Sequence, residues 1–362
     1  MHVAVGQNQF SDGGPTLVSE LELAGIETHQ LTSLGRDISL GADIRALMQL
    51  TSLMRELRPD VVHLNSSKMS VMGGIASTLS RTPRSVFTAH GFPFFEDRSK
   101  SAQVGLEVLT RLGVVLLDDL ITLSAKESDY ALKWREARSK VHLVPNGISA
   151  TNVYERVESR RILSEALGPA SSRLDDDLIL IGSIAELHPN KNIETTLRAL
   201  GKLTKSRPAA RFKYFHFGTG ELEQELESLR EELGLQEVAH FLGFRSDARR
   251  LLSAFDIFVL PSKKEGLPYS LLEAALARNA IVSSAVGGIP SVLRNDAGLL
   301  LEDPTNVDEL HDHLSALLTD DELRNGLGLA AENRVAEVFT VEKMIQATEA
   351  IYSGSPLGPS TS

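Results

Sequence analysis

Two glutamates, Glu265 and Glu273, flank a short turn that is well suited to binding an anion. The turn contains Gly266 and Pro268 and follows an apolar run that has the pattern of a strand. Glycine lets the backbone approach a ligand closely, and proline is favoured at the first position of a helix. A helix that begins at about Pro268 presents unpaired N–H groups and the positive end of its dipole, which together can bind a diphosphate.

The two carboxylates need partners other than phosphate, because charges of the same sign repel each other. Hydroxyl groups are suitable partners, since an ionised carboxylate accepts strongly from O–H. Glu273, one turn inside the helix, can reach a ribose diol, and Glu265 in the preceding loop can reach a sugar ring. Alternatively, Glu273 is a solvated helix residue and Gly266 only forms a turn. The combined arrangement favours a ligand that contains ribose, diphosphate and a hexose.

The elements that position this turn belong to a parallel α/β architecture. Short β-branched or apolar runs alternate with longer helical patterns along the whole chain. One expected helix is Ile44–Leu57, whose apolar residues recur at helical spacing. The expected strands are His2–Val5, Glu27–Leu31, Val61–Leu64, Val86–Ala89, Leu120–Leu123, His142–Val144, Leu178–Ile184, Lys213–Phe217, His240–Leu242, Ile257–Leu260, Ile281–Ser284 and Gly298–Leu301.

The pattern breaks at Pro145–Asn146–Gly147, which predicts two doubly wound domains that face a cleft. We expect ligands at the carboxyl ends of the strands. The expected parts are an acceptor-side domain over residues 1–147 and a nucleotide-sugar domain over 148–338. A helix over 339–352 is expected to pack back on the first domain, and the tail over 353–362 is expected to be disordered.

Composition excludes several classes of protein. With 362 residues the chain has room for two domains, and its lack of cysteine excludes disulfides and thiolate metal sites. A net charge of −11 makes a general nucleic-acid binder improbable. The longest apolar run, Leu112–Leu123, is interrupted by Asp118 and Asp119, and no signal peptide is visible. We therefore expect a cytoplasmic protein, with peripheral contact to the cytoplasmic membrane as a further possibility.

Several motifs together resemble a known family. Glu265 and Glu273 form the E-x7-E pattern of retaining, GT-B-fold glycosyltransferases of family 4. The segment TAHGFPF is similar to a subgroup that builds bacterial surface polysaccharides. Further similar segments are IGSIAELHPNKNIETTLRAL at 181–200, FGTGEL at 217–222, FLGFRSDARRLLSAFDIFVLP at 241–261, VPNGI at 144–148 and TAHGFPF itself at 88–94.

The resemblance implies roles for matching residues on the donor side. Lys191 would neutralise the donor diphosphate, Glu273 would hold the ribose and Glu265 the transferred sugar. The glycine turn at Gly218 would approach the donor. Residues that would line the phosphates, the sugar or the base are Gly266, Leu267, Tyr269, Phe244 and Arg245.

The first domain would contribute His90, which faces the donor sugar in this interpretation. A histidine after a strand is often structural, but Gly91 and the aromatic residues around it favour a functional role. Asn65, Ser66 and Lys68 follow another strand and would bind the acceptor, a lipid-diphosphate-linked saccharide. They are equally compatible with an ordinary loop.

Two features depart from the family pattern. Many members carry an arginine five residues before the lysine, whereas this chain has Glu186, so Lys191 acts alone or with Lys263 or Lys264. The family also begins with a strand, a glycine-rich loop and a helix. Met1–Gly6 instead resembles the second strand, and Gly13–Gly14–Pro15 follows it, so the first domain is expected to lack its first strand–helix unit and to expose a sheet edge.

The resemblance thus implies a retaining hexosyltransferase that uses a UDP-sugar, needs no cofactor and binds no metal. No Asp-x-Asp at a strand end and no histidine–aspartate group with ligand spacing is visible. Lys191 and the helix start would stabilise the departing diphosphate. Two alternatives are a truncated protein that binds nucleotide sugars without turnover, and a nucleotide-sugar epimerase, which would not need the E-x7-E segment.

Overall fold

The computed structural model describes residues 1–6, 17–35, 39–96, 98–150, 152–168, 174–175 and 177–355. The chain divides into two compact units. Unit 1 comprises Met1–Thr122, Ser128–Leu143 and Ile351–Ser355, and unit 2 comprises Leu123–Glu127 and Val144–Ala350. The predicted loop at 13–15 and the tail beyond residue 355 lie outside the described residues.

Unit 1 contains two parallel sheets. A four-stranded sheet has the order β3-β4-β5-β6, and strands β1 and β2 pair with each other in a separate sheet. The strands are β1 (His2–Val5), β2 (Glu27–Gln30), β3 (Val61–Leu64), β4 (Arg84–Ala89), β5 (Asp119–Thr122) and β6 (Val141–Leu143).

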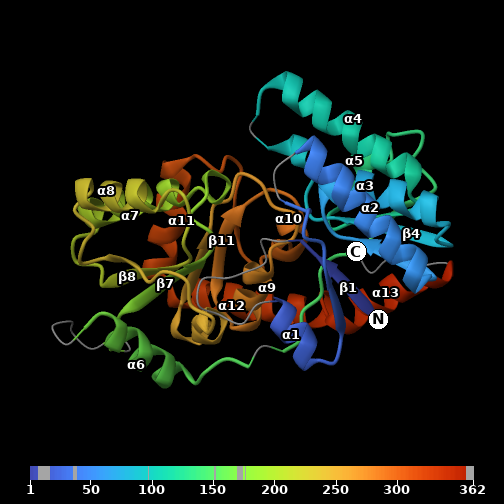
Figure 1. Ribbon diagram of the computed structural model, residues 1–362. Coiled ribbons are helices and arrows are strands. Elements are labelled where there is room, and N and C mark those ends of the chain that lie inside the picture. The colour runs from blue at the N-terminus through green and yellow to red at the C-terminus, as the bar shows by residue number, and fades with distance from the viewer. Residues whose placement is uncertain are drawn as a thin grey trace. The chain divides into compact units, whose positions relative to one another are not determined.

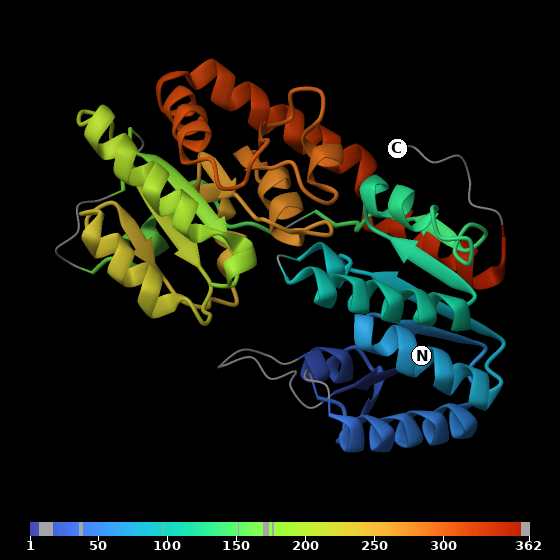
Figure 2. The same cartoon turned by 90° about the horizontal axis from the view of Figure 1, so that it is seen from above.

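Helices α2, α3 and α4 pack side by side along unit 1, as the blue to teal helices of Figure 2 show. Its core gathers around Phe87, Phe92, Leu120 and Trp134, all buried. The helices of this part of the chain are α1 (Leu17–Leu23), α2 (Leu40–Leu57), α3 (Ser67–Ser80), the 3-10 turn η1 (Pro93–Phe95), α4 (Lys100–Leu116) and α5 (Ala125–Ala131).

Unit 2 contains a six-stranded parallel sheet of order β12-β11-β10-β7-β8-β9. Consecutive strands are joined through helices, which is the doubly wound pattern. The strands are β7 (Ile179–Ile184), β8 (Phe212–Phe217), β9 (Ala239–Phe241), β10 (Ile257–Leu260), β11 (Ala280–Ser284) and β12 (Leu299–Leu301).

Helices cover both faces of this sheet. In Figure 1, α7, α8 and α11 lie on one side of β7 and β8, and α6 lies on the other. The helices are α6 (Arg156–Ala166), η2 (Pro189–Lys191), α7 (Ile193–Ser206), α8 (Glu223–Glu232), η3 (Ala248–Ala254), α9 (Tyr269–Leu276), α10 (Ile289–Leu293), α11 (Val307–Thr319), α12 (Asp321–Val338) and α13 (Val341–Ser353).

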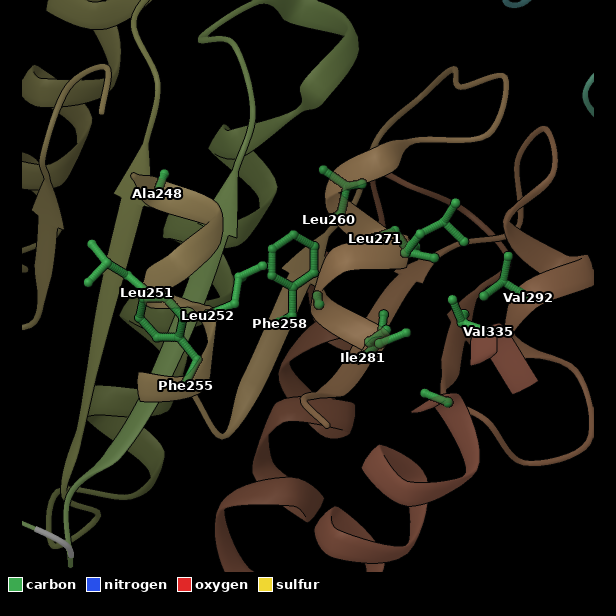
Figure 3. Close-up of a cluster of buried hydrophobic side chains, with 14 of the residues drawn as sticks. Ala248, Leu251, Leu252, Phe255, Phe258, Leu260, Leu271, Ile281, Val292 and Val335 are labelled. Atoms are coloured by element: carbon green, nitrogen blue, oxygen red, sulfur yellow. The ribbon is translucent and has the colours of Figure 1, made fainter. Parts of the chain in front are cut away.

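Alternate residues of the central strand β10 belong to the two cores. Ile257 and Val259 pack in the cluster around α7 and α11, whereas Phe258 and Leu260 pack in the cluster around η3, α9 and α12. Figure 3 shows the second cluster, with Phe258 and Leu260 among the other apolar side chains. Because both faces of the strand are buried, its sequence is apolar throughout.

One carboxylate ties helix α6 to two strands. The carboxylate of Asp256 accepts hydrogen bonds from Arg156 Nη2 at 2.7 Å, Arg160 Nη2 at 3.1 Å and the backbone N–H of Leu180 at 2.8 Å. Asp256 immediately precedes β10, and Leu180 lies in β7. The same aspartate therefore joins three elements.

The predicted parallel α/β sheets are confirmed: the strand order reverses in unit 2, as in a doubly wound sheet, whereas β3 to β6 of unit 1 follow the chain order. A strand lies at every predicted range, with ends shifted by at most two residues, and helix α2 begins four residues before the predicted Ile44. Helix α13 contributes residues to both units, and in unit 1 the hydroxyl of Tyr352 lies 2.5 Å from His63 Nδ1. Within the described residues, the helices are all too short or too polar to cross a membrane.

Candidate functional site

An ion pair between Lys191 and Glu265 lies at the carboxyl end of the unit 2 sheet. Lys191 Nζ donates to Glu265 Oε1 over 2.7 Å, and Ser262 Oγ donates to the same oxygen over 2.7 Å. The glutamate side chain is only 9% exposed and the lysine side chain 26%. Two residues that the sequence assigned to one ligand thus lie together, although 74 positions separate them in the chain.

The loop after β10 is tied to the loop after β7, which positions this pair. Asn192 adopts a left-handed conformation with φ of 55°, and its Nδ2 donates to the carbonyl groups of Pro261 and Pro304. The backbone N–H of Lys263 donates to Asn190 O over 2.8 Å. Lys191 therefore projects from a backbone that is fixed on both sides.

The turn that the sequence predicted as an anion site has the expected form. Pro268 is the N-cap residue, so α9 begins at Tyr269, one residue later than predicted. Leu267 is buried, and its carbonyl accepts a hydrogen bond from Asn146 Nδ2 over 2.7 Å. Because proline has no side-chain acceptor, the first N–H groups of α9 receive no cap from it. These groups can donate to an anion.

Two glycines after β11, Gly287 and Gly288, pack against the backbone of the turn at Glu265 and Gly266. The backbone N–H of Gly288 donates to Gly266 O over 2.6 Å. Gly287 has φ of +55°, and a Cβ atom there would lie 2.1 Å from Glu265 O. Only glycine therefore permits this approach. The segment from Glu265 to Pro268 is held by contacts that a larger residue would break.

Glu273 lies in the second turn of α9 and is half-buried. Burial raises the pKa of its carboxyl above the ordinary value, and the positive charge of Arg249 lowers the pKa by a smaller amount. A partly desolvated carboxylate of this kind accepts strongly from hydroxyl groups. The environment is therefore suited to the diol that the sequence analysis assigned to Glu273.

The glycine turn after β8 packs directly on the loop after β7. Gly218 has φ of +142°, and a Cβ atom there would lie 1.9 Å from Ala185 O. Its N–H donates to Gly243 O over 2.9 Å, which joins this turn to the loop after β9. That loop carries Phe244, exposed at the surface, and Arg245, which forms two hydrogen bonds of 2.9 Å with Asp247.

In unit 1 the structure brings His90 and Asn65 together. His90 Nε2 lies 3.3 Å from Asn65 Oδ1, and both residues follow parallel strands. Partial desolvation lowers the pKa of the His90 imidazole. A neutral imidazole beside an amide can donate or accept a hydrogen bond near neutral pH.

The other two predicted acceptor residues have structural partners. Ser66 is the N-cap of α3, and its hydroxyl accepts from the N–H of Met69 over 3.3 Å. Lys68 Nζ forms an ion pair with Asp43 Oδ1 at 2.6 Å and donates to Gly35 O over 3.1 Å. Their role toward an acceptor stays a prediction.

Three residues near the site were not singled out from the sequence. Ser262 and Asn192 hold the Lys191–Glu265 pair and the loop beneath it. His216 is fully buried, with its ring nitrogens within 3.0–3.3 Å of Ala185 O, Ser183 Oγ and Tyr214 OH. Burial lowers the pKa of His216 to about 4. Ser262 lies inside the motif PSKKEG, so its position next to Glu265 was the available signal.

Comparison with known proteins identifies the relatives of this chain. Residues 168–334 match the model of glycosyl transferases group 1, and residues 11–152 match the model of Glycosyltransferase Family 4. Over 325 residues, 88% of this chain and 82% of the relative, the sequence is 26% identical to the UDP-Gal:alpha-D-GlcNAc-diphosphoundecaprenol alpha-1,3-galactosyltransferase of Escherichia coli.

A second relative is an N,N'-diacetylbacillosaminyl-diphospho-undecaprenol alpha-1,3-N-acetylgalactosaminyltransferase of Campylobacter jejuni. It is 40% identical over 108 residues, 30% of this chain and 28% of the relative. Among solved structures, HepE of Anabaena in complex with UDP and glucose superposes with a TM-score of 0.80 at 21% identity, over 97% of this chain and 91% of that one. The chain therefore belongs to the GT-B glycosyltransferases of group 1 and family 4.

Proposed function

We propose that this glycosyltransferase transfers a hexose or N-acetylhexosamine from a UDP-sugar to a lipid-linked saccharide, with retention of the anomeric configuration. The observation that carries the proposal is the Lys191–Glu265 pair beside the start of α9. A cation, a carboxylate and the uncapped N–H groups of a helix start therefore come together, although Lys191 and Glu265 lie 74 positions apart in the chain. A nucleoside diphosphate sugar needs all three.

In this mechanism Lys191 exchanges its contact with Glu265 for the donor diphosphate. The cation and the first turn of α9 stabilise the negative charge that develops on the leaving group, and no metal ion is required for that step. Gly266, Leu267 and Tyr269 line the phosphates and the sugar, while Glu273 accepts from the ribose. Exposed Glu186 stands where many relatives carry an arginine, so Lys263 or Lys264 would supply any second positive charge.

On the acceptor side, His90 and Asn65 would contact the donor sugar and the acceptor. The acceptor hydroxyl attacks from the face that the nucleotide leaves, and a phosphate oxygen of the leaving group accepts its proton. The names of the two relatives described above both specify an acceptor linked to diphosphoundecaprenol. That likeness supports a lipid-linked saccharide as the acceptor here.

Helix α4 supports contact with a lipid surface. Its most exposed positions between residues 101 and 116 carry no charged side chain, and Val104, Val108, Leu112 and Val115 are 62%, 51%, 51% and 55% exposed. The side chain of Arg111, 43% exposed, pairs with Glu136 beside this face. The carboxylate of the same helix, Glu107, accepts hydrogen bonds from Tyr130 and Trp134. An uncharged helix face of this length is suited to lie in the interface of a bilayer, where a lipid-linked acceptor would be found.

The membrane contact is tested by flotation with vesicles of phosphatidylethanolamine and phosphatidylglycerol. Val108→Glu and Leu112→Glu should each reduce the bound fraction, because they place a charge in the apolar face. Leu329→Glu is the matched control, since Leu329 is 47% exposed on α12 of unit 2. Equal binding of the α4 variants and the control would refute the assignment of this surface.

The transfer itself is tested by a donor screen with polyprenyl-diphosphate-linked acceptors and detection by mass spectrometry. An α-linked product from an α-linked UDP-sugar demonstrates retention, whereas a β-linked product contradicts it. UDP binding without transfer to any acceptor would favour a protein that only binds nucleotide sugars. Conversion of the donor to an epimer without acceptor would favour the epimerase.

A further inference from the structure

Two histidines and a glutamate gather on the two-stranded sheet of unit 1. His2 lies in β1 and pairs in register with Glu27 of β2, and His29 follows two residues later on β2. Residues two apart on a strand point to the same face. Among the described residues, these three form the one group of potential metal ligands whose ligand atoms lie within 4.8 Å of one another.

The distances among the three side chains match a tetrahedral metal site. His2 Nδ1 lies 3.1 Å from His29 Nε2, Glu27 Oε2 lies 3.5 Å from His2 Nδ1, and Glu27 Oε1 lies 3.7 Å from His29 Nε2. A zinc ion with ligands at about 2.0–2.1 Å in tetrahedral geometry holds those ligands about 3.3–3.4 Å apart. The ring centroids are 5.3 Å apart with planes inclined at 37°, so the rings approach through their nitrogens rather than by stacking.

We propose that His2, Glu27 and His29 bind a divalent transition-metal ion, zinc in the first instance. Imidazole nitrogen and carboxylate oxygen are ligands that Zn²⁺ accepts readily, and a water molecule would complete four-coordination. His2 and Glu27 are exposed, which leaves the fourth position open to solvent. Without a metal, one imidazole would donate an N–H to the nitrogen of the other over 3.1 Å; with zinc bound, both nitrogens would be deprotonated and face the ion together with Glu27.

The metal would join β1 to β2. A pair of strands that hydrogen-bond only to each other is marginally stable in water, and within the described residues β1 and β2 are such a pair. One ion held by a side chain of β1 and two of β2 would fix their register. The role is structural, and it does not depend on the donor site or on the transfer proposed above.

The test uses the untagged full chain after treatment with a chelator. Calorimetry with Zn²⁺ should give one site per chain, and Co²⁺ should give the visible absorption bands of a tetrahedral complex. His29→Ala and Glu27→Gln should each weaken binding by at least about 10- to 100-fold, the range found when even outer-shell partners are lost. His311→Ala is the matched control, because His311 lies beside the single carboxylate Asp312, and it should bind zinc as the wild type does.

A measurement on the wild-type protein tests the site even if the variants fold poorly. Paramagnetic Co²⁺ should shift or broaden the imidazole signals of His2 and His29 first among the ten histidines of the chain. Saturable binding that leaves these two signals unchanged, or zinc affinity in His29→Ala equal to that of the wild type, would overturn the proposal. Absence of stoichiometric zinc binding by the wild type would do the same.

Discussion

Replacement of Lys191 by Met separates the role of its charge in catalysis from its role in the fold. A unit charge about 4 Å from a phosphate oxygen contributes about 4 kcal/mol at an effective dielectric constant of about 20. The lysine side chain is 26% exposed, so solvent screens part of this energy and we expect roughly 3 kcal/mol. That corresponds to a loss of about 100-fold in kcat/KM.

The same change leaves the Glu265 carboxylate, 9% exposed, without its cation. Ser262 Oγ continues to donate to it, but a nearly buried charge without an ionic partner destabilises the fold. Lys191→Met should therefore lower the melting temperature as well as the activity. The double variant Lys191→Met/Glu265→Gln should regain stability, because the buried charge is gone, yet it should stay inactive.

The assay measures UDP release in the presence of acceptor, together with thermal unfolding. Lys202→Met is the matched control, since Lys202 forms an exposed ion pair with Asp308 and should keep normal activity and stability. Activity of Lys191→Met within a few-fold of the wild type would refute the proposed role of its charge. Recovery of activity in the double variant would show that only the unpaired glutamate had caused the loss.

Three further outcomes follow from the described geometry. Glu273→Gln should weaken UDP binding in calorimetry by about 10-fold or more. Burial raises the pKa of the Glu273 carboxyl, so its ionisation lowers the stability of the fold as the pH rises above the unfolded pKa. The variant, which cannot ionise, should therefore unfold no more easily than the wild type at pH 7. Gly287→Ala should destabilise the protein and impair transfer, because the new Cβ would collide with Glu265 O. Gly234→Ala is the control: its φ is +70° but the space around it is open, so the free energy of unfolding should fall by only about 1–2 kcal/mol. Burial lowers the pKa of His216 to about 4, so stability that is complete above about pH 6.5 should fall toward pH 4, by up to about 1.4 kcal/mol per pH unit for this residue. His216→Gln should flatten that part of the stability profile, and an unchanged profile would contradict the assignment.

The central strands were predictable because both of their faces are buried, whereas β1 and β2 are largely exposed. A strand such as Ile257–Leu260 needs apolar residues throughout, so the run is visible without knowledge of its neighbours. The turn at Gly266 and Pro268 was likewise local, since glycine and proline act on their own backbone. Strand ends shifted by a residue or two because terminal hydrogen bonds depend on the adjacent strand.

Contacts between distant segments were not predictable from spacing. The sequence assigned Lys191 and Glu265 to one ligand by family resemblance, but their direct ion pair depends on how β7 and β10 place their following loops. The group formed by His2, Glu27 and His29 was overlooked for the same reason. Its members lie on two strands, and a search for ligands at short sequence intervals does not detect them.

The exposed face of α4 could not be predicted from the sequence either. The sequence analysis tested the apolar run Leu112–Leu123 only as a membrane span, and two aspartates excluded it. In the structure, Leu112 and Val115 are exposed while Val114 and Leu117 are buried. The run therefore divides between core and surface, which a composition argument cannot resolve.

The aspartate that links α6 to the sheet has a consequence for anyone who alters unit 2. Asp256 serves Arg156, Arg160 and the backbone of Leu180 at once, so energies measured for changes at these positions should not add. A helix grafted in place of α6 would need both guanidinium groups to keep all three hydrogen bonds, since Arg156 donates to Oδ1 whereas Arg160 shares Oδ2 with the Leu180 N–H. A chimera should therefore exchange helix α6 together with strands β7 and β10. Exchange of one of these segments alone would leave some of the hydrogen bonds to the aspartate unmade.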